Sequence, residues 1–434
     1  MAGLYVVNDA TFSSLATGAI IVVAVAVLGS LTVLPALLAK LGRWVDRPRV
    51  PLLWRVNRRI GRGGISRRLL APVLRHPKAS LLVSGLIVAA LAVPALGMTM
   101  KEGTLETLPQ DLPEVRTAQA IQAQFPSSGS TLEVAVKTTG DSSEVVPALK
   151  QLSDEAAKAG LVADDDAIRT SRDGSVSVLT LASPYADGSE QTQQALETVR
   201  EDLAPNTLDR LPGSEWAVGG DTAESADFTD HQRAALPWVI GFVLLLTLVM
   251  MGVTFRSVPI ALITTVLNLA SVAAAFGVLS LVFQHSWAEG LLDFHSSGYV
   301  INWIPLFLFV VLVGLSMDYH VFVLSRIREG VSRGLPSKVA IEAGVTETAG
   351  VVTSAAAVMV SVFAIFATLS MLEMKQMGVG LSVAILVDAT LVRVVMLPSI
   401  LALLGDKAWW PRRIRRPLPE PVVVEEPRVP VAVR

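Results

Sequence analysis

The stretch that decides the fold is 259–282, PIALITTVLNLASVAAAFGVLSLV, which runs for 24 residues without a charged side chain. A bilayer core of about 30 Å needs about 20 apolar residues of helix, so this stretch can cross a membrane. Six further stretches are also long and apolar enough to cross a membrane, and they lie at 15–39, 79–98, 237–254, 303–325, 350–371 and 377–404. The chain of 434 residues is 52% hydrophobic and only 17% charged. The sequence therefore predicts an α-helical polytopic membrane protein with about seven transmembrane helices.

Residue types suited to catalysis or metal binding are scarce. The chain has no cysteine, which excludes a disulfide framework and a thiolate nucleophile. The five histidines are scattered without the paired spacing of zinc sites, at His76, His231, His285, His295 and His320. The sequence contains neither a nucleophile–base pair nor a phosphate-binding loop. We therefore expect a protein that is not an enzyme and that has no cofactor or metal site.

The segment between the first two apolar stretches is strongly basic. Residues 40–78 contain twelve Lys and Arg but one acid, Asp46. Basic flanks of membrane helices mark the cytoplasmic side, whereas binding of nucleic acid is a much weaker interpretation. Alternation along seven spans places three further basic flanks on the same side, at Arg256, 326–338 and 412–416. Since all four flanks agree, we predict that they are cytoplasmic.

The segment between the second and third spans, 101–236, is then extracytoplasmic. Residues 101–235 hold 24 acids and 10 bases, a net charge of −14. Apolar residues alternate as in strands at 131–138 (TLEVAVKT), 175–182 (SVSVLTLA) and 215–219, and they have helical spacing at 142–159 and 189–203. The order is close to β-α-β-β-α-β, which predicts an α+β ferredoxin-like domain.

Two segments resemble each other, which indicates an internal duplication of the kind found in transporters. Residues 31–42 read LTVLPALLAKLG, and residues 394–405 read VVMLPSILALLG. Only the end of a first repeat precedes the basic segment, so we expect either that the ancestral first half was lost or that this chain is a C-terminal piece of a longer protein. The expected parts are a transmembrane helix ending a truncated first repeat (1–40), a basic cytoplasmic linker (41–78), a second transmembrane helix (79–100), the extracytoplasmic α/β domain (101–236), a five-helix transmembrane bundle (237–405) and a cytoplasmic Arg/Pro-rich tail (406–434).

Ionisable residues lie deep in two of the predicted membrane helices. Asp318 is about fifteen residues into its helix, about 22 Å from the outer end, and Asp388 is near the middle of the last span. Intramembrane acids are costly and usually functional, so we expect both carboxylates to face the bundle interior, with Asp318 as a proton relay. Structural pairing is the alternative, and for Asp388 the two roles are equally favoured.

Three neighbouring polar residues are candidates for the same intramembrane network. Arg393 follows Asp388 by five residues, about 140° round an α-helix, so we expect the two not to face each other. Arg393 is then expected to snorkel or to bond backbone. Thr353 and Ser354 could extend a polar track, but bonding to their own helix carbonyls is the favoured interpretation.

One specific motif is Gly314-Leu315-Ser316-Met317-Asp318-Tyr319, followed by Leu324-Ser325-Arg326-Ile327-Arg328-Glu329. Others are Val218–Ala223 (VGGDTA), Thr353–Ala356 (TSAA), Asp388-Ala389, Val392-Arg393 and Leu397-Pro398. Together, and in their order along the chain, these motifs resemble the actinobacterial MMPL transporters of the resistance-nodulation-division superfamily. They correspond to the second half of the family, in which the 101–236 domain would be a porter domain.

The resemblance implies export of lipids or other amphiphiles across the plasma membrane, driven by proton influx through an Asp-Tyr pair. Asp318 and Tyr319 match that pair, while the family's equivalent pair on its fourth helix has no counterpart in this chain. A partner supplying the first half, or a homo-oligomer, is therefore expected. The alternatives are an assembly or secretion-accessory factor of the same superfamily, and an inactive truncated remnant.

The predicted topology can be tested by protease shaving of intact spheroplasts. We expect cleavage within 101–236 and protection of 40–78, because only the former is placed outside the membrane. The reverse pattern would overturn the assigned orientation.

Overall fold

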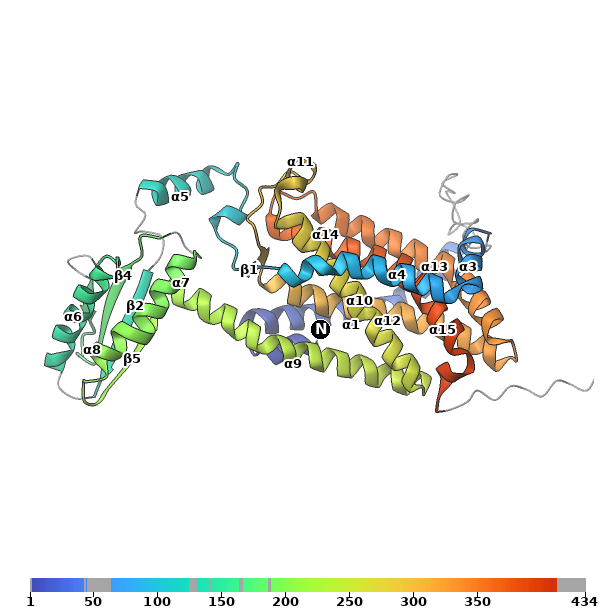
Figure 1. Ribbon diagram of the computed structural model, residues 1–434, viewed down its shortest axis with the longest axis horizontal. Coiled ribbons are helices and arrows are strands. Elements are labelled where there is room, and N and C mark those ends of the chain that lie inside the picture. The colour runs from blue at the N-terminus through green and yellow to red at the C-terminus, as the bar shows by residue number, and fades with distance from the viewer. Residues whose placement is uncertain are drawn as a thin grey trace, which may run out of the picture.

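The computed structural model describes residues 2–42, 44, 64–124, 131–139, 142–163, 167–185 and 189–411. Much of the predicted basic linker (43 and 45–63) and the tail beyond 411 lie outside the described residues. Helices dominate the described chain, and a small α/β unit extends from one end of a helical bundle (Figure 1).

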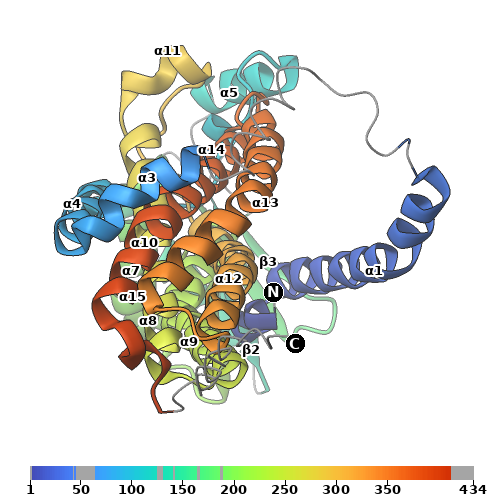
Figure 2. The same cartoon turned by 90° about the vertical axis from the view of Figure 1, so that its right-hand side faces the viewer.

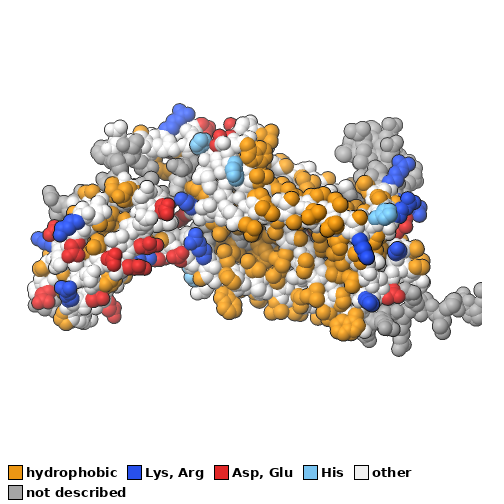
Figure 3. All heavy atoms as spheres, in the orientation of Figure 1, with side chains coloured by type: hydrophobic (Ala, Val, Ile, Leu, Met, Phe, Trp, Pro, Cys, Tyr) orange, Lys and Arg blue, Asp and Glu red, His pale blue; other side chains and the backbone are white. Residues whose placement is uncertain are grey.

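Within the described part of the chain, seven apolar helices are long enough to cross a membrane. They are α1 (Ala10–Leu41), α4 with η3 (Pro77–Ala92 and Val93–Gly97), α9 (Asp221–Phe255), α10 (Val258–Phe283), α12 (Trp303–Ser332), α13 (Ser337–Phe366) and the unit formed by α14 (Leu372–Val387), η9 (Asp388–Met396), α15 (Leu397–Leu404) and η10 (Gly405–Trp409). Each expected span overlaps one of them, which confirms the polytopic helical fold. Hydrophobic side chains cover the bundle surface in Figure 3, and charged side chains gather at its two ends.

Shorter elements connect these helices or precede them. They are η1 (Ala2–Val7), α3 (Gly64–Arg75), β1 (Met100–Lys101), η4 (Leu105–Thr107), α5 (Pro113–Gln124), η8 (Ser286–Ala288), α11 (Glu289–Leu292) and β6 (Val300–Ile301). β1 and β6 pair in parallel at the end of the bundle that faces the α/β unit (Figure 1).

Two helices, α10 and α12, form the centre of the bundle. Of their most apolar stretches, 61% and 56% of residues are buried, against 11% for α13. α10 can be central because residues 270–277, ASVAAAFG, are mostly small, and small residues let neighbouring helices approach closely. At Gly277 the approach is closest: an added Cβ would lie 1.9 Å from the Leu91 carbonyl oxygen at the end of α4.

The first apolar helix, α1, packs on the bundle only through its beginning. Phe12 and Ala16 are buried in one cluster with Val239 and Val243 of α9, and Val7 accepts a hydrogen bond from His231 Nε2 at 2.6 Å. Beyond these turns the helix extends away from the other helices (Figure 2), and none of its most apolar stretch is buried.

The two copies of the internal repeat end in the same backbone geometry. Gly42 has φ 47° and donates its N–H to the Leu38 carbonyl, while Gly405 has φ 55° and donates to the Leu401 carbonyl. With ψ of −117° and −129°, these conformations strongly favour glycine, because it has no Cβ. The similarity detected in the sequence therefore extends to three dimensions.

The α/β unit has one four-stranded sheet covered by helices. Its elements are β2 (Thr131–Thr138), η6 (Ser142–Glu144), α6 (Val145–Lys158), β3 (Ile168–Thr170), β4 (Val176–Ala182), α7 (Glu190–Glu197), η7 (Thr198–Leu203), α8 (Ala204–Leu208) and β5 (Ser214–Gly219). The strand order is β3-β4-β2-β5, and every neighbouring pair is antiparallel. Alternation in β2 buries Leu132, Val134 and Val136 against Leu149 and Leu152 of α6. The segments expected as strands and helices are confirmed, and the short β3 was not located from the sequence.

The turn between β3 and β4 is held by one carboxylate. Asp173 accepts hydrogen bonds from the Ser171 hydroxyl, the Ser175 hydroxyl and the Ser175 backbone N–H. These donors, the Ser171 hydroxyl foremost, lower the pKa of Asp173 to about 2. Hydrogen bonds to this one carboxylate therefore account for the turn.

A glycine joins the sheet to the bundle. Gly220, between β5 and α9, has φ 92°, and an added Cβ would lie 2.6 Å from the Thr131 carbonyl oxygen. From there α9 runs for 35 residues, about 52 Å, which exceeds the bilayer core and carries the helix out to the sheet. One helix therefore belongs to both parts of the molecule (Figure 1).

We predict that Gly277→Ala destabilises the bundle by about 1–3 kcal/mol, because the added methyl group forces α4 and α10 apart. The matched control is Gly241→Ala in α9, where nothing lies within 4 Å of the new Cβ. That change should be neutral or stabilising by up to about 1 kcal/mol, since alanine favours helix. Thermal unfolding in one detergent measures both, and equal midpoints for the two variants would contradict the close approach.

Candidate functional site in the membrane bundle

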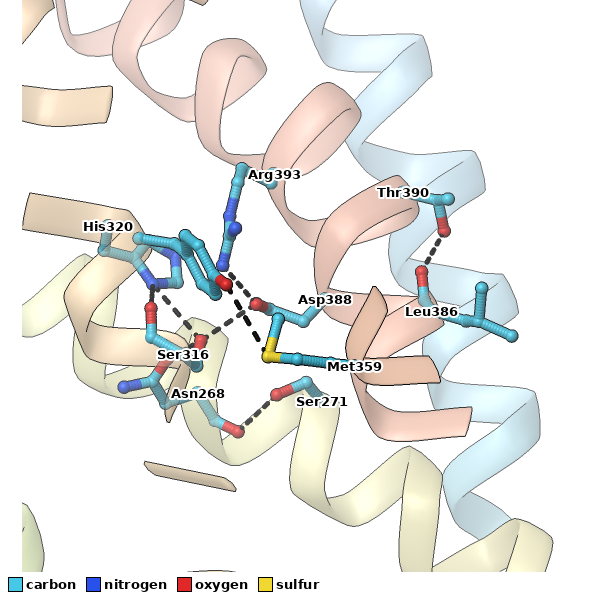
Figure 4. A network of polar contacts seen from close by, with 10 residues as sticks. Asn268, Ser271, Ser316, His320, Met359, Leu386, Asp388, Thr390 and Arg393 are labelled. Atoms are coloured by element: carbon cyan, nitrogen blue, oxygen red, sulfur yellow. Dashed lines mark hydrogen bonds and ion pairs between the residues drawn. The ribbon is translucent and has the colours of Figure 1, made fainter. Parts of the chain in front are cut away.

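A group of polar side chains lies where α10, α12 and η9 meet inside the bundle. Ser316 and His320 come from α12, Asn268 and Ser271 from α10, and Asp388 and Arg393 from η9 (Figure 4). Asp388 and Arg393 are 7% and 3% exposed, and Ser316 and His320 are buried as well. The surrounding spans are apolar, so these groups depend on one another for hydrogen bonds.

Asp388 and Arg393 form an ion pair, in which Arg393 Nη2 donates to Asp388 Oδ2. The expectation that they point to different sides, and that Arg393 snorkels, is therefore wrong. The reason is the local backbone: residues 388–396 form a π-helix, in which hydrogen bonds join residues five apart. A residue and the fifth after it then share one face, whereas an α-helix would separate them by about 140°.

Ser316 links the ion pair to the rest of the group. Its hydroxyl oxygen lies 2.9 Å from Asp388 Oδ1 and 2.8 Å from Asn268 Oδ1. Three elements, α12, η9 and α10, are thus held together by contacts at one side chain. A cavity of about 10 Å³ borders Ser271, Ser316 and Asp388, which is room for about one water molecule.

Tyr319 lies on the rim of this group. The Arg393 guanidinium is 4.6 Å from the centre of the Tyr319 ring, which is within the range of cation–π attraction. The Tyr319 hydroxyl donates to Met359 Sδ of α13 at 3.6 Å. Tyr319 therefore contacts the buried pair through its ring and α13 through its hydroxyl.

Asp318 points away from the buried group. Its side chain is exposed, and no hydrogen bond or ion pair involving it occurs among the described residues. The expectation that both acids face the bundle interior is thus wrong for Asp318 and right for Asp388. Ser316 and Asp318 are two residues apart, about 200° round an α-helix, so only one of them can face inward. Gly314, one turn before Asp318, also lies on an uncovered face, since nothing lies within 4 Å of an added Cβ.

Thr353 and Ser354 of α13 are exposed and do not join the network. Ser354 donates to the Val351 carbonyl of its own helix at 2.9 Å, which agrees with the favoured interpretation. Thr353 instead borders an apolar groove of about 350 Å³ between α13 and η9, whose wall includes Arg393.

Asn268, Ser271 and His320 were not assigned a role from the sequence. The signal for Asn268 was its amide within an otherwise apolar span, and polar residues at such depth usually bond to another helix. His320 directly follows Tyr319, but its inward direction depends on the helix packing. Among the residues that the structure describes, no group of three or more acids and histidines could hold a metal ion.

Comparison with known proteins gives a consistent picture. The model of the MMPL family matches residues 1–96 and 106–424. The chain is 33% identical over 425 residues to the mycolic acid-containing lipids exporter MmpL11 of Mycolicibacterium smegmatis, covering 96% of this chain and 44% of that protein. It is 32% identical over 439 residues to the heme uptake protein MmpL11 of Mycobacterium tuberculosis, covering 96% and 43%.

A third relative is the trehalose monomycolate exporter MmpL3 of Mycobacterium tuberculosis, which is 29% identical over 457 residues, covering 95% of this chain and 47% of that protein. The chain thus spans less than half the length of these three curated relatives. The match to the family model extends over nearly all of this chain. With seven apolar helices and this match, the chain is a multi-pass membrane protein that belongs to the MMPL family.

Proposed function

We propose that this chain acts as the C-terminal half of a transporter that exports lipids or other amphiphilic small molecules across the plasma membrane, driven by the proton motive force. Residues 101–236 would form an extracytoplasmic porter domain of ferredoxin-like fold, with 41–78 and 406–434 in the cytoplasm. The antiparallel strand order β3-β4-β2-β5, with two helical segments between strands, supports that assignment of the domain.

The observation that carries the proposal is the exposed carboxylate of Asp318 in the middle of an apolar helix. A charged residue at the bilayer centre costs about 2.5–3.5 kcal/mol even on the insertion scale. That cost is avoided if another polypeptide covers this face of α12. The exposed length of α1 supports the same idea, because the helix has few contacts with its own chain. A first half or a second copy of the chain would complete the transporter.

In this transporter Asp318 would take up and release the coupling proton, and Tyr319 would position it or donate to it. Tyr319 is well placed because its ring contacts Arg393, the partner of Asp388. A change of charge at Asp318 would then act on the buried pair of Asp388 and Arg393 through the Tyr319 side chain. The ion pair of Asp388 and Arg393 would hold the Tyr319 ring in one position.

The substrate class rests on the relatives. Two of the three relatives are named as exporters of mycolic acid-containing lipids and of trehalose monomycolate, and the third is named as a heme uptake protein. Each of these cargoes combines a large apolar part with a polar part. An assembly or secretion-accessory role remains the second candidate, since the acidic domain could bind a partner protein.

We predict that Asp318→Asn reduces proton-driven transport by about 100-fold or more, because the amide keeps the shape of the side chain but cannot carry a proton. The assay uses proteoliposomes that contain the chain, a polypeptide supplying the first repeat, and a mycolic-acid-containing lipid or heme as probe. Asp154→Asn, which changes an exposed acid of α6, is the control and should transport normally. Transport by the Asp318 variant at the normal rate would refute the relay.

We also predict that Arg393→Met destabilises the protein by about 3–5 kcal/mol, because it leaves the Asp388 carboxylate buried without a partner. Adding Asp388→Asn should restore much of that loss, since the uncompensated charge is gone. The control, Arg67→Met, breaks an exposed ion pair with Glu342 of 2.7 Å and should cost at most about 1 kcal/mol. The measurement is the unfolding midpoint of each of the three variants. Equal loss of stability in Arg393→Met and Arg67→Met would contradict the claim that burial makes the Arg393 pair the more important one.

A further inference from the structure

His320 is the most deeply enclosed titratable side chain of the network, and the proposed relay does not use it. It lies on α12 one turn beyond Ser316, and its side chain is 0% exposed. Figure 4 shows the ring directed toward Ser316. His320 and Asp318 are two residues apart, about 200° round an α-helix, so they lie on opposite sides of α12. The four other histidines are all exposed.

The two ring nitrogens have unequal surroundings. Nδ1 lies 3.0 Å from the Ser316 carbonyl oxygen and 3.3 Å from the Ser316 hydroxyl oxygen. Nε2 is buried and has no hydrogen-bond partner among the described residues. Nδ1 donates to the carbonyl oxygen in the tautomer that has the proton on Nδ1, and it can accept from the Ser316 hydroxyl in the tautomer that has the proton on Nε2.

The Ser316 hydroxyl is shared by more acceptors than it has hydrogens. It has one hydrogen, yet Asn268 Oδ1 and Asp388 Oδ1 both lie within 3 Å of its oxygen. Both of these oxygens accept, so only one of them can receive the Ser316 hydrogen when Asp388 is ionised. An added proton on Asp388 satisfies all three groups, and it can pass through Ser316 to the imidazole.

We propose that His320 is a second proton-binding residue of the membrane domain, which exchanges a proton with Asp388 through the Ser316 hydroxyl. This inference deepens the proposed function and rests on it. In the transfer, the Asp388 O–H bond breaks as the proton moves to Ser316 Oγ, and the Ser316 hydroxyl proton forms an N–H bond at Nδ1 of a ring already protonated at Nε2. Asp388 becomes a carboxylate and His320 an imidazolium, so the proton count is unchanged.

Charged groups of both signs lie near His320. Asp388 and Arg393 of η9 are the charged groups that act on it, with opposite signs. α10 has no ionisable residue. On α13, Glu347 is exposed and Glu342 pairs with Arg67. The imidazolium is therefore stabilised chiefly by Asp388, which is the group that ionises when the proton is transferred.

The direct test is nitrogen NMR of the full chain in lipid bilayers, labelled at histidine. Replacement of the four exposed histidines, His76, His231, His285 and His295, leaves His320 as the only signal. We expect the signal to change from a neutral to a doubly protonated ring on acidification. In the Asp388→Asn background the protonated fraction at a given pH should fall about tenfold, equivalent to one pH unit. A ring that stays neutral, or a titration that Asp388→Asn does not alter, would overturn the proposal.

Two substitutions separate proton binding from a merely structural role. The amide nitrogen of His320→Asn occupies the place of Nδ1 and can still donate to the Ser316 carbonyl, but no second nitrogen can take a proton. We expect this variant to fold normally and to lose the pH dependence of transport in the same proteoliposomes, while His285→Asn keeps it. A normal pH profile in His320→Asn would show that His320 only positions Ser316.

The tests of His320 and Asp318 can fail separately, so they distinguish the further inference from the proposed function. If Asp318→Asn transports normally, the proposed coupling fails whatever His320 does. If Asp318→Asn abolishes transport while His320 stays neutral, only the second proton site is wrong.

Discussion

The ion pair of Asp388 and Arg393 constrains the interior of the bundle, because neither charge can be left alone in an apolar environment. The pairing requires side chains five residues apart to share one face, and the chain achieves this by forming a π-helix at 388–396. Once the pair is formed, Ser316 is held against it at 2.9 Å and Asn268 against Ser316 at 2.8 Å. The relative positions of α10, α12 and η9 therefore depend on a few polar contacts within otherwise non-directional packing.

The pair also explains why α12 has two polar faces. Ser316 and His320 face inward toward the pair, so Asp318 has to face outward. Tyr319 lies between the two faces and contacts the guanidinium of Arg393 through its ring. In a complete transporter, a second polypeptide against the outer face of α12 would bring its own groups next to Asp318. Proton exchange at the outer face and charge in the inner network would then be coupled across the thickness of one helix.

The α/β unit is connected to this network by a continuous helix. α9 begins at Gly220 beside β2, leaves the sheet and packs against α10 in the bundle. α9 is one helix of 35 residues with Pro237 in its interior, so it connects the bundle directly to the sheet. This gives a mechanical route between the membrane interior and the proposed porter domain.

The amino-acid sequence by itself determined the features that depend on local pattern. The seven spans follow from long apolar runs, the strands at 131–138 and 176–182 from alternation, and the helix at 190–197 from its helical spacing. The repeat was visible because the same proline and glycine recur at the same spacing. What only the tertiary structure decided is the direction of the charged side chains. A helix that is apolar on all sides does not show from its sequence which side faces the interior. A π-helix cannot be recognised when side-chain directions are calculated with the 100° rotation per residue of an α-helix. The pairing of Asp388 with Arg393 and the outward direction of Asp318 were set by the packing of helices far apart in the chain, because that packing decides which charges can be buried together.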